Sequence, residues 1–429
     1  MNAHAVPNAD RPVLATVAVP GSKSLSNRAL VCAALADGES EITELAPGDD
    51  TVAMVECLGR LGIEVEAGEC LALVRGTGGR LRRGPITLPA RLAGTTSRFV
   101  TALAALGAGP YTIDGEPPLR SRPMGPLHDA LTALGADVTA GERPGHLPVT
   151  VSGPPTGHRV TIRGDVSSQY VTALMLIAPL LADGLVIDVA GHLVSRPYVE
   201  ITAAVMRDFG VPDVVVGEHQ VRVPRATYEP TRYAVEPDAS SASYPLALAA
   251  LVGGTVTVPG LTPVSQQGDA RFAELLAEMG CQVIATEADT TVTRDPTSSL
   301  LGIDVDMADV SDLVPTLAVV AVLATSSTRI RGVGFIRGKE SDRLGDLAGE
   351  LTKLGARVTV TDDGLDIEPI AAEQLRGARL VTHHDHRLAM AFGVLGAAVP
   401  GVEVDDPGVV SKSWPGFWDD LAAALRGAP

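Results

Sequence analysis

The amino-acid sequence predicts an α/β fold built from six repeated units. Five helix-like stretches end in an apolar residue plus glycine, about 70–75 residues apart, and run into β-rich sequence. Six Ala/Leu-rich helices, each followed by a glycine turn and a Val-, Ile- or Thr-rich strand, alternate with them. Self-similarity at a fixed period indicates repeated supersecondary units, so we expect equivalent residues of different units to converge. The five stretches end at Leu61-Gly62, Leu134-Gly135, Phe209-Gly210, Met279-Gly280 and Leu354-Gly355, and the six helices start near Asn27, Ser97, Ser168, Ser243, Asp312 and His386.

Each long unit follows one order: helix, strand, helix ending in glycine, strand, turn and strand. Residues 346–355, followed by 356–361 and 364–368, are one example. The glycine fits a helix C-terminus, where a left-handed backbone is needed. The Val- and Thr-rich pieces after it alternate with the period of two that is typical of strands.

The two ends of the chain carry incomplete units, which predicts a discontinuous domain. Residues 416–426 form a helix with no strand pair after it, and 13–19 form a strand with no helix before it. We expect this N-terminal strand to complete the last unit. The six units then divide three and three, into an inserted domain at 21–236 and a discontinuous domain at 1–20 and 237–429. The alternative is a single solenoid of six units.

Length and composition bound the class of protein. At 429 residues the chain is long enough for two domains, and its four cysteines show no paired spacing, which is typical of small core residues in a reducing compartment. No signal peptide opens the chain, and its apolar runs are too short to span a membrane. We therefore expect a cytoplasmic protein. The net charge of −17 argues against nucleic acid and anionic membranes as partners.

Small, hydroxylic or cationic residues begin each of the six Ala/Leu-rich helices. Free backbone N–H groups and the helix dipole make such places anion sites. Helix capping by Ser, Thr and Asp is the alternative explanation. Capping does not explain Lys23, Arg28 and Arg387, because a cation at a helix N-terminus is unfavourable unless an anion lies between them.

More cations lie in three connecting segments, 120–123, 337–343 and 410–415. Each segment alone could be a solvated surface run. Arg343 could also belong to an i,i+3 ion pair at a helix start.

These strings together resemble the enolpyruvyl transferase family over essentially the whole chain, and specifically the branch that acts on shikimate 3-phosphate. The matching strings are PGSKS (20–24) with Asn27 and Arg28, AGT (93–95) with Arg98, RSRP (120–123), VSSQ (166–169), LVSRPY (193–198), KESDR (339–343), DHR (385–387) and SK (411–412).

The resemblance implies a two-domain inside-out α/β barrel of six βαβαββ units, three per domain, with the active site in the cleft between the domains. It implies transfer of the enolpyruvyl group of phosphoenolpyruvate to the 5-hydroxyl of shikimate 3-phosphate, with release of phosphate through a tetrahedral intermediate. This reaction belongs to the shikimate pathway to chorismate and the aromatic amino acids. The resemblance further implies a monomer that needs neither cofactor nor metal and that glyphosate inhibits.

The same resemblance assigns roles to individual residues. Lys23, Asp312 and Glu340 are expected to be catalytic, with Glu340 as the acid/base at C3 of phosphoenolpyruvate and Asp312 as the base for the hydroxyl. Shikimate 3-phosphate is expected to contact Ser24, Arg28, Ser167, Ser168, Ser195, Tyr198 and Lys339. Phosphoenolpyruvate is expected to contact Lys23, Gly94, Arg122, Gln169, Arg343, Arg387 and Lys412.

Four positions depart from the family pattern. Leu92 and Phe99 flank the AGT string where many relatives have Asn and Pro, and both are expected at the wall of the phosphoenolpyruvate pocket. Arg196 replaces a common lysine. Phe335 occupies a usually polar position, so we expect no substrate contact from it.

Four alternatives remain at this point. The sister transferase that acts on UDP-N-acetylglucosamine usually has Lys-Asn at the first helix and a cysteine in the loop that is 119–122 here. RNA 3′-phosphate cyclase has related units but needs a histidine nucleophile and a basic surface. A structural repeat protein would not need the set of cations. Residues 383–386 (HHDH) could also indicate a metal site.

Overall fold

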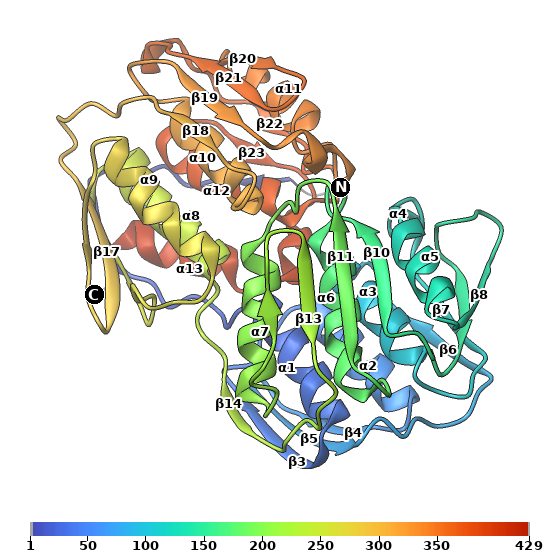
Figure 1. Cartoon of the computed structure of the whole chain (residues 1–429). Coiled ribbons are helices and arrows are strands. Elements are labelled where there is room, and N and C mark those ends of the chain that lie inside the picture. The colour runs from blue at the N-terminus through green and yellow to red at the C-terminus, as the bar shows by residue number, and fades with distance from the viewer. Residues whose placement is uncertain (1–2, 428–429) are drawn as a thin grey trace. The chain divides into compact units, whose positions relative to one another are not determined.

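The computed structural model describes residues 3–427 of the chain (Figure 1). Contacts between Cα positions divide it into two compact units, Met1–Pro20 with Pro237–Pro429 and Gly21–Glu236. Both units repeat the order strand, helix, strand, helix, strand, strand. The predicted α/β fold of six repeats is therefore confirmed.

The unit at 21–236 contains three repeats, and each has its own four-stranded sheet. Its helices are α1 (Lys23–Leu35), α2 (Asp49–Arg60), α3 (Gly94–Ala104), α4 (Pro117–Arg120), α5 (Gly125–Ala133), α6 (Ser168–Ile177) and α7 (Pro197–Asp208). Its strands are β3 (Asp37–Thr43), β4 (Glu64–Ala67), β5 (Leu71–Thr77), β6 (Ile86–Pro89), β7 (Tyr111–Asp114), β8 (Asp137–Ala140), β9 (Val149–Ser152), β10 (Arg159–Arg163), β11 (Leu185–Ala190), β12 (Val215–Val216), β13 (Gln220–Val223) and β14 (Arg232–Ala234).

The other unit contains the remaining three repeats, with two four-stranded sheets and one three-stranded sheet in its described part. Its helices are α8 (Ala239–Val252), α9 (Phe272–Glu278), α10 (Val314–Ala321), α11 (Gly345–Lys353), α12 (His386–Ala398) and α13 (Phe417–Arg426). Its strands are β1 (His4–Ala5), β2 (Val13–Thr16), β15 (Gly254–Pro259), β16 (Gln282–Ala285), β17 (Asp289–Arg294), β18 (Asp304–Asp306), β19 (Thr328–Arg331), β20 (Arg357–Val360), β21 (Leu365–Glu368), β22 (Arg379–Leu380) and β23 (Glu403–Val404).

All five four-stranded sheets share one topology. In the sheet ordered β6-β7-β9-β8, the first two strands are parallel, because α3 crosses over between them, and the last two form an antiparallel hairpin. The register of the central antiparallel pair places Ile113 opposite Val149. Where the two parallel strands are consecutive in the chain, the inner helix forms the crossover between them, as α3, α6 and α10 do.

The prediction for the N-terminal strand is wrong about which repeat this strand completes. Strand β2 pairs in parallel with β15, with Leu14 opposite Thr255, and so completes the fourth repeat rather than the last. The last repeat instead receives the two-residue strand β1, which is antiparallel to β23. The physical reason is that α8 follows β14, which already pairs with β3 of the first repeat. The fourth repeat must therefore take its first strand from elsewhere in the chain.

The predicted glycine stops are confirmed. Helices α2, α5, α7, α9 and α11 each end two residues before a glycine with a left-handed backbone. A side chain is strained in this conformation, whereas glycine adopts it readily. The φ values are +93°, +93°, +86°, +97° and +91° at Gly62, Gly135, Gly210, Gly280 and Gly355.

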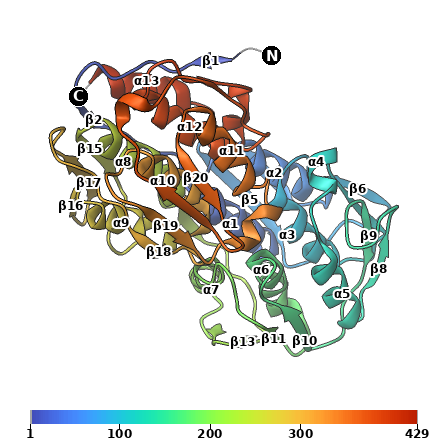
Figure 2. The same ribbon diagram turned by 90° about the horizontal axis from the view of Figure 1, so that it is seen from above.

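One helix of each repeat is buried on all sides. In the unit at 21–236 these inner helices are α1, α3 and α6, which contact one another, and α8, α10 and α12 are their counterparts (Figures 1 and 2). A helix that is apolar on every side must lie inside a core. Three cysteines lie in these cores, but Cys70 is exposed, which corrects the expectation that all four are core residues.

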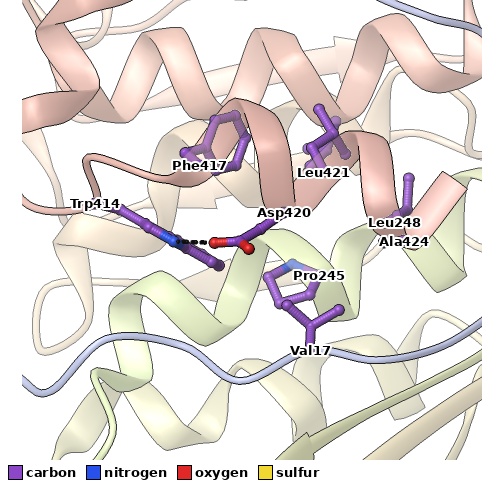
Figure 3. A pocket seen from close by; sticks show the side chains of 9 residues that line it. Val17, Pro245, Leu248, Trp414, Phe417, Asp420, Leu421 and Ala424 are labelled. Carbon is purple, nitrogen blue, oxygen red and sulfur yellow. Dashed lines mark hydrogen bonds between the residues drawn. The ribbon is translucent and has the colours of Figure 1, made fainter. Parts of the chain in front are cut away.

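A small apolar cavity lies beside α13 in the unit that contains both chain ends (Figure 3). Val17, Pro245 and Leu421 are among its lining residues, and Trp414 Nε1 donates a hydrogen bond to Asp420 Oδ2 at 2.8 Å at its edge. None of the predicted substrate-binding residues lines it. Over residues 3–427, no helix is long and apolar enough to cross a membrane.

Candidate functional site

Several of the predicted site residues lie at the starts of inner helices, among them Lys23 on α1, Gly94 on α3 and Arg387 on α12. In the unit at 21–236, Ser22 caps α1 and Ser167 caps α6 through their side-chain oxygens. Helix α3 begins at Gly94 and has no side-chain cap. The first N–H groups of a helix have no partner within the helix, so each of these starts can donate to an anion. Capping and anion binding are thus both available to α1 and α6.

Lys23 forms a buried ion pair. Its Nζ lies 3.3 Å from Oδ2 of Asp50, which is in the first turn of α2, and the two side chains are 13% and 3% exposed. This carboxylate compensates for the cation at the start of α1. Because the ammonium is held in place by Asp50, its position is fixed before any substrate arrives.

All three guanidinium nitrogens of Arg28 donate hydrogen bonds within its unit. Its Nε donates to Thr202 Oγ1 at 2.8 Å, and its Nη2 donates to the carbonyl of Tyr198 at 3.0 Å. Its Nη1 donates to the carbonyl of Ser24 at 2.7 Å, and the guanidinium lies over the ring of Phe99 at 5.4 Å. Burial lowers the pKa of Arg28 to about 10, so it stays charged at neutral pH. The arginine joins α1 to α7 in this state.

Gly94 and Arg122 are brought together. A Cβ placed on Gly94 would lie 2.5 Å from Nη1 of Arg122 and 2.8 Å from Nη1 of Arg98. Arg98 donates to the carbonyls of Gly94 and Pro123 at 2.9 Å and 3.1 Å. Tyr170 Oη also donates to the Pro123 carbonyl, at 2.6 Å. The absence of a side chain at position 94 therefore makes room for two guanidinium groups.

The remaining predicted residues of this unit lie at the starts of α6 and α7. Gln169 Nε2 donates to Thr95 Oγ1 at 3.4 Å, which joins the start of α6 to the start of α3. Ser195 is 4% exposed and has a φ of +54°, a conformation that is uncommon for residues other than glycine. Its carbonyl accepts the N–H of Tyr198 at 3.1 Å. Ser168 is the first residue of α6.

In the other unit, Arg343 is the centre of a buried ionic network. It is 1% exposed, and its Nε lies 2.7 Å from Asp385 Oδ2. Its Nη1 lies 2.8 Å from Asp312 Oδ1, and its Nη2 lies 2.9 Å from Glu340 Oε2. Burial opposes the charge of Arg343, but the three carboxylates raise its pKa above the usual value. The i,i+3 pair with Glu340 is present, but it is one of three and is not a surface pair.

Arg387 and Lys412 extend the network. Arg387 Nη2 lies 2.8 Å from Asp312 Oδ2 and 3.5 Å from Ser240 Oγ, and Lys412 Nζ lies 3.2 Å from Glu340 Oε1. Burial opposes ionisation of Asp312, but Arg387 and the neighbouring cations outweigh it and hold the pKa of Asp312 well below its usual range. Asp312 and Glu340 are thus carboxylates that bridge cations.

Lys339 occupies the edge of this network. Its Nζ lies 5.8 Å from the centre of the Phe335 ring, within the range of a cation–π contact. The charge of Lys339 also contributes to the lowered pKa of Asp312. Phe335 therefore contacts a predicted substrate-binding lysine although no substrate contact is expected from Phe335 itself.

Sequence reasoning missed the carboxylates that hold the cations. Asp385 is 0% exposed, contacts Arg343 and accepts the N–H of Arg387 at 2.9 Å. Asp50 has the same relation to Lys23. Asp385 lies inside the DHR string, and this proximity in sequence was the available signal. Asp50 gave none, since acidic residues are common in first turns.

Arg196, one of the departures from the family pattern, pairs with Glu200 at 2.8 Å and donates to the carbonyls of Val216 and Gly217, at the end of β12. In the described part of the chain, no group of three or more His, Cys, Asp or Glu side chains could hold a metal ion, and this includes residues 383–386.

A repeated α/β fold whose two units each hold buried cations at or near helix starts is typical of an enzyme that binds anionic substrates. The family described as EPSP synthase (3-phosphoshikimate 1-carboxyvinyltransferase) matches residues 7–421. The chain therefore belongs to the EPSP synthase family. The predictions of this family, of an enzyme and of a transferase are confirmed.

Relatives are similar over nearly their whole length. A 3-phosphoshikimate 1-carboxyvinyltransferase of Nostoc punctiforme is 42% identical over 417 residues, which cover 96% of this chain and 97% of that protein. Another, of Methanosphaerula palustris, is 43% identical over 416 residues, with coverage of 96% and 97%. A structure of EPSP synthase from Acinetobacter baumannii has a TM-score of 0.81 at 23% sequence identity and covers 99% of this chain and 98% of that one. At that identity the likeness supports the fold alone.

Proposed function

We propose that the chain transfers the enolpyruvyl group of phosphoenolpyruvate to the 5-hydroxyl of shikimate 3-phosphate and releases phosphate. The reaction serves the shikimate pathway to chorismate. The observation that carries the proposal is the network around Arg343, in which Arg387 and Lys412 join two bridging carboxylates, in a chain that matches this family over residues 7–421. Both substrates carry a phosphate and a carboxylate, and arginine binds such groups in a bidentate manner.

The chemistry proceeds by addition and then elimination. In the addition, the 5-hydroxyl oxygen forms a bond to C2 of phosphoenolpyruvate, the hydroxyl loses its proton, and C3 gains one to become a methyl group. In the elimination, C3 loses a proton, the bond from C2 to the phosphate oxygen breaks, and the vinyl double bond returns. Each half therefore needs one group that accepts a proton and one that donates a proton.

Glu340 is the proposed acid/base at C3. Arg343 and Lys412 hold its two carboxylate oxygens at 2.9 Å and 3.2 Å, so its position is defined from both sides. Binding of the phosphoenolpyruvate anion beside these cations weakens their hold on Glu340. A less compensated carboxylate binds a proton more readily, as delivery to C3 requires.

Asp312 is the proposed base for the 5-hydroxyl, and its environment sets a condition on this role. Its lowered pKa makes it a weak base while Arg387 and Arg343 face it. When an anionic substrate shares these guanidinium groups, the pKa of Asp312 rises toward its ordinary value. The base would thus be activated by the arrival of phosphoenolpyruvate, so that chemistry waits for both substrates.

The substrate seats are proposed from the same pattern. Shikimate 3-phosphate is assigned to Ser24, Arg28, Ser167, Ser168, Ser195, Tyr198 and Lys339, and phosphoenolpyruvate to Lys23, Gly94, Arg122, Gln169, Arg343, Arg387 and Lys412. Lys23 is also assigned a catalytic role, stabilising the charge that develops as phosphate leaves. The N-termini of α1 and α6, with Ser24 and Ser168 in their first turns, support the phosphate seat.

We further propose that 21–236 and 1–20 with 237–429 are the two domains of the enzyme and that both contribute to one active site. The support is that each contains part of the predicted set of substrate-binding residues. Our sequence-based expectations of a monomer, of cytoplasmic localisation and of activity without cofactor or metal are part of the same proposal.

The experiment is a phosphate-release assay with purified protein and phosphoenolpyruvate. Release is expected only when shikimate 3-phosphate is present, and it should persist in a chelator and without nucleotide. The matched control replaces shikimate 3-phosphate with UDP-N-acetylglucosamine. Equal release with that acceptor, or loss of release in the chelator, would overturn the proposal.

A further inference from the structure

The turn between β22 and α12 contains two adjacent residues in unfavourable backbone conformations. His383 and His384 have φ values of +50° and +58°. Left-handed conformations are uncommon for residues other than glycine, and they persist where the surroundings hold them. The turn closes when the N–H of Asp385 donates to the carbonyl of Thr382 at 2.8 Å. Neither histidine belongs to the proposed substrate seats, so the conformation needs another explanation.

A buried carboxylate on α11 holds the turn. The side chain of Glu350 is 6% exposed, and its Oε1 lies 3.0 Å from Nε2 of His383. Its Oε2 accepts the N–H of Val381 at 2.8 Å and lies 2.6 Å from Nζ of Lys353. Glu350 therefore contacts the backbone before the turn and the imidazole within it, and these two contacts fix the path of the chain.

The other imidazole nitrogen of His383 faces a second carboxylate of α11. Nδ1 lies 3.7 Å from Asp346 Oδ1, and Asp346 Oδ2 accepts the N–H of Asp342 at 3.0 Å. Asp342 directly precedes Arg343 in the chain. His383 lies in the turn that leads to α12, and through Asp346 it is connected to the segment that carries Arg343.

The residue after this turn is Asp385, which contacts both arginines of the phosphoenolpyruvate seat. Its Oδ2 accepts a hydrogen bond from Nε of Arg343 at 2.7 Å, and its Oδ1 accepts one from the backbone N–H of Arg387 at 2.9 Å. We propose that His383, held by Glu350, is a positioning residue that fixes Asp385 and thereby places Arg343 and Arg387 for phosphoenolpyruvate. The proposal rests on the proposed function, since it concerns the substrate that these arginines bind.

His384 provides a matched control in the same turn. Its backbone carries the same strain, but its side chain is 72% exposed and its Nδ1 lies 3.4 Å from the partly exposed Asp406. A substitution at His384 therefore tests the effect of altering the turn without removing the contact to Glu350.

The experiment compares His383→Ala, His383→Asn, His383→Gln and His384→Ala in steady-state kinetics. His383→Ala should raise the KM for phosphoenolpyruvate about tenfold, the worth of one charge-assisted hydrogen bond, with a much smaller effect on kcat. Asparagine tolerates the left-handed backbone but is too short to reach Glu350, so His383→Asn should behave like alanine. Glutamine can donate an amide N–H to Glu350 and should recover most of the loss. His384→Ala should resemble wild type.

Two further readouts separate the possible failures. Affinity for shikimate 3-phosphate should be unchanged in every variant, and Glu350→Gln, which keeps an acceptor, should lose less than Glu350→Ala. An unaltered KM in both His383→Ala and Glu350→Ala, with active wild type, would overturn the positioning role alone. Wild type that does not consume phosphoenolpyruvate would instead overturn the proposed function. If alanine at 383 prevents folding, failure of His383→Gln to recover more activity than His383→Asn would overturn the role.

Discussion

Substitution of Gly94 by alanine tests the proposed phosphoenolpyruvate seat on α3. The new Cβ would lie 2.5 Å from Nη1 of Arg122, 3.0 Å from its Cζ and 2.8 Å from Nη1 of Arg98. Separations below 3 Å require one of the atoms to move. Both arginine groups are the far ends of flexible side chains, so we expect the protein to fold and the guanidinium of Arg122 to shift.

The size of the effect follows from what Arg122 then loses. A hydrogen bond to a charged group is worth about 1.5–3 kcal/mol, which corresponds to roughly 10–150-fold in affinity. We expect the KM for phosphoenolpyruvate to rise roughly 10-fold, the lower end of this range. Glyphosate should lose more, because the resemblance places this inhibitor in the space that the methyl group enters.

The assay is an inhibition series for wild type and Gly94→Ala at fixed shikimate 3-phosphate. Gly59→Ala is the control, since an added Cβ there meets nothing within 4 Å and alanine favours the helix. Wild type should be sensitive to glyphosate. An unchanged KM and unchanged inhibition in Gly94→Ala would refute the reasoning. Resistance of wild type would mean that the buried Phe99 has already reshaped the pocket.

Three further predictions concern the ionic groups. Lys23→Ala and Arg387→Ala should each lose most turnover while thermal unfolding remains cooperative, because each removes a cation from the proposed phosphoenolpyruvate seat; near-normal turnover in either would mean a misplaced site. Glu340→Gln should lower turnover about 100-fold or more with little change in calorimetric binding of shikimate 3-phosphate; the opposite pattern would make Glu340 structural. Asp312 has a lowered pKa, so its contribution to folding is present above its unfolded value of about 3.9 and lost as the pH falls. In Asp312→Asn, the free energy of unfolding measured in urea should therefore fall less steeply as the pH drops below about 4; an unchanged slope would contradict this.

Local features of the fold could be predicted because they depend on a few neighbouring residues. The glycine after each outer helix is one example, since its left-handed backbone is a requirement of that single position. Strand partners could not be assigned in the same way. Tyr233 pairs with Ile42, and Leu14 pairs with Thr255, across about 190 and 240 residues of chain. No local pattern encodes such a choice.

The candidate site shows the same division. The cations could be identified because a positive charge at a helix start is unfavourable without a partner, as for Lys23 and Arg387. Their protein partners Asp50 and Asp385 resemble ordinary first-turn and capping residues in the sequence. What distinguishes them is burial against a cation, and burial depends on packing. The left-handed backbone at His383 has the same cause and was equally hidden.

The most direct test of the account is the reaction in deuterium oxide, with the product analysed by mass spectrometry and proton NMR. Addition followed by elimination passes through a methyl group at C3, so the product should be shikimate 3-phosphate that carries an enolpyruvyl group with deuterium in its methylene. In Glu340→Gln, the rate at which deuterated product forms should fall in proportion to the fall in turnover. An enolpyruvyl product without deuterium would contradict the proton transfers at C3, and the absence of any such product would contradict the proposed function itself.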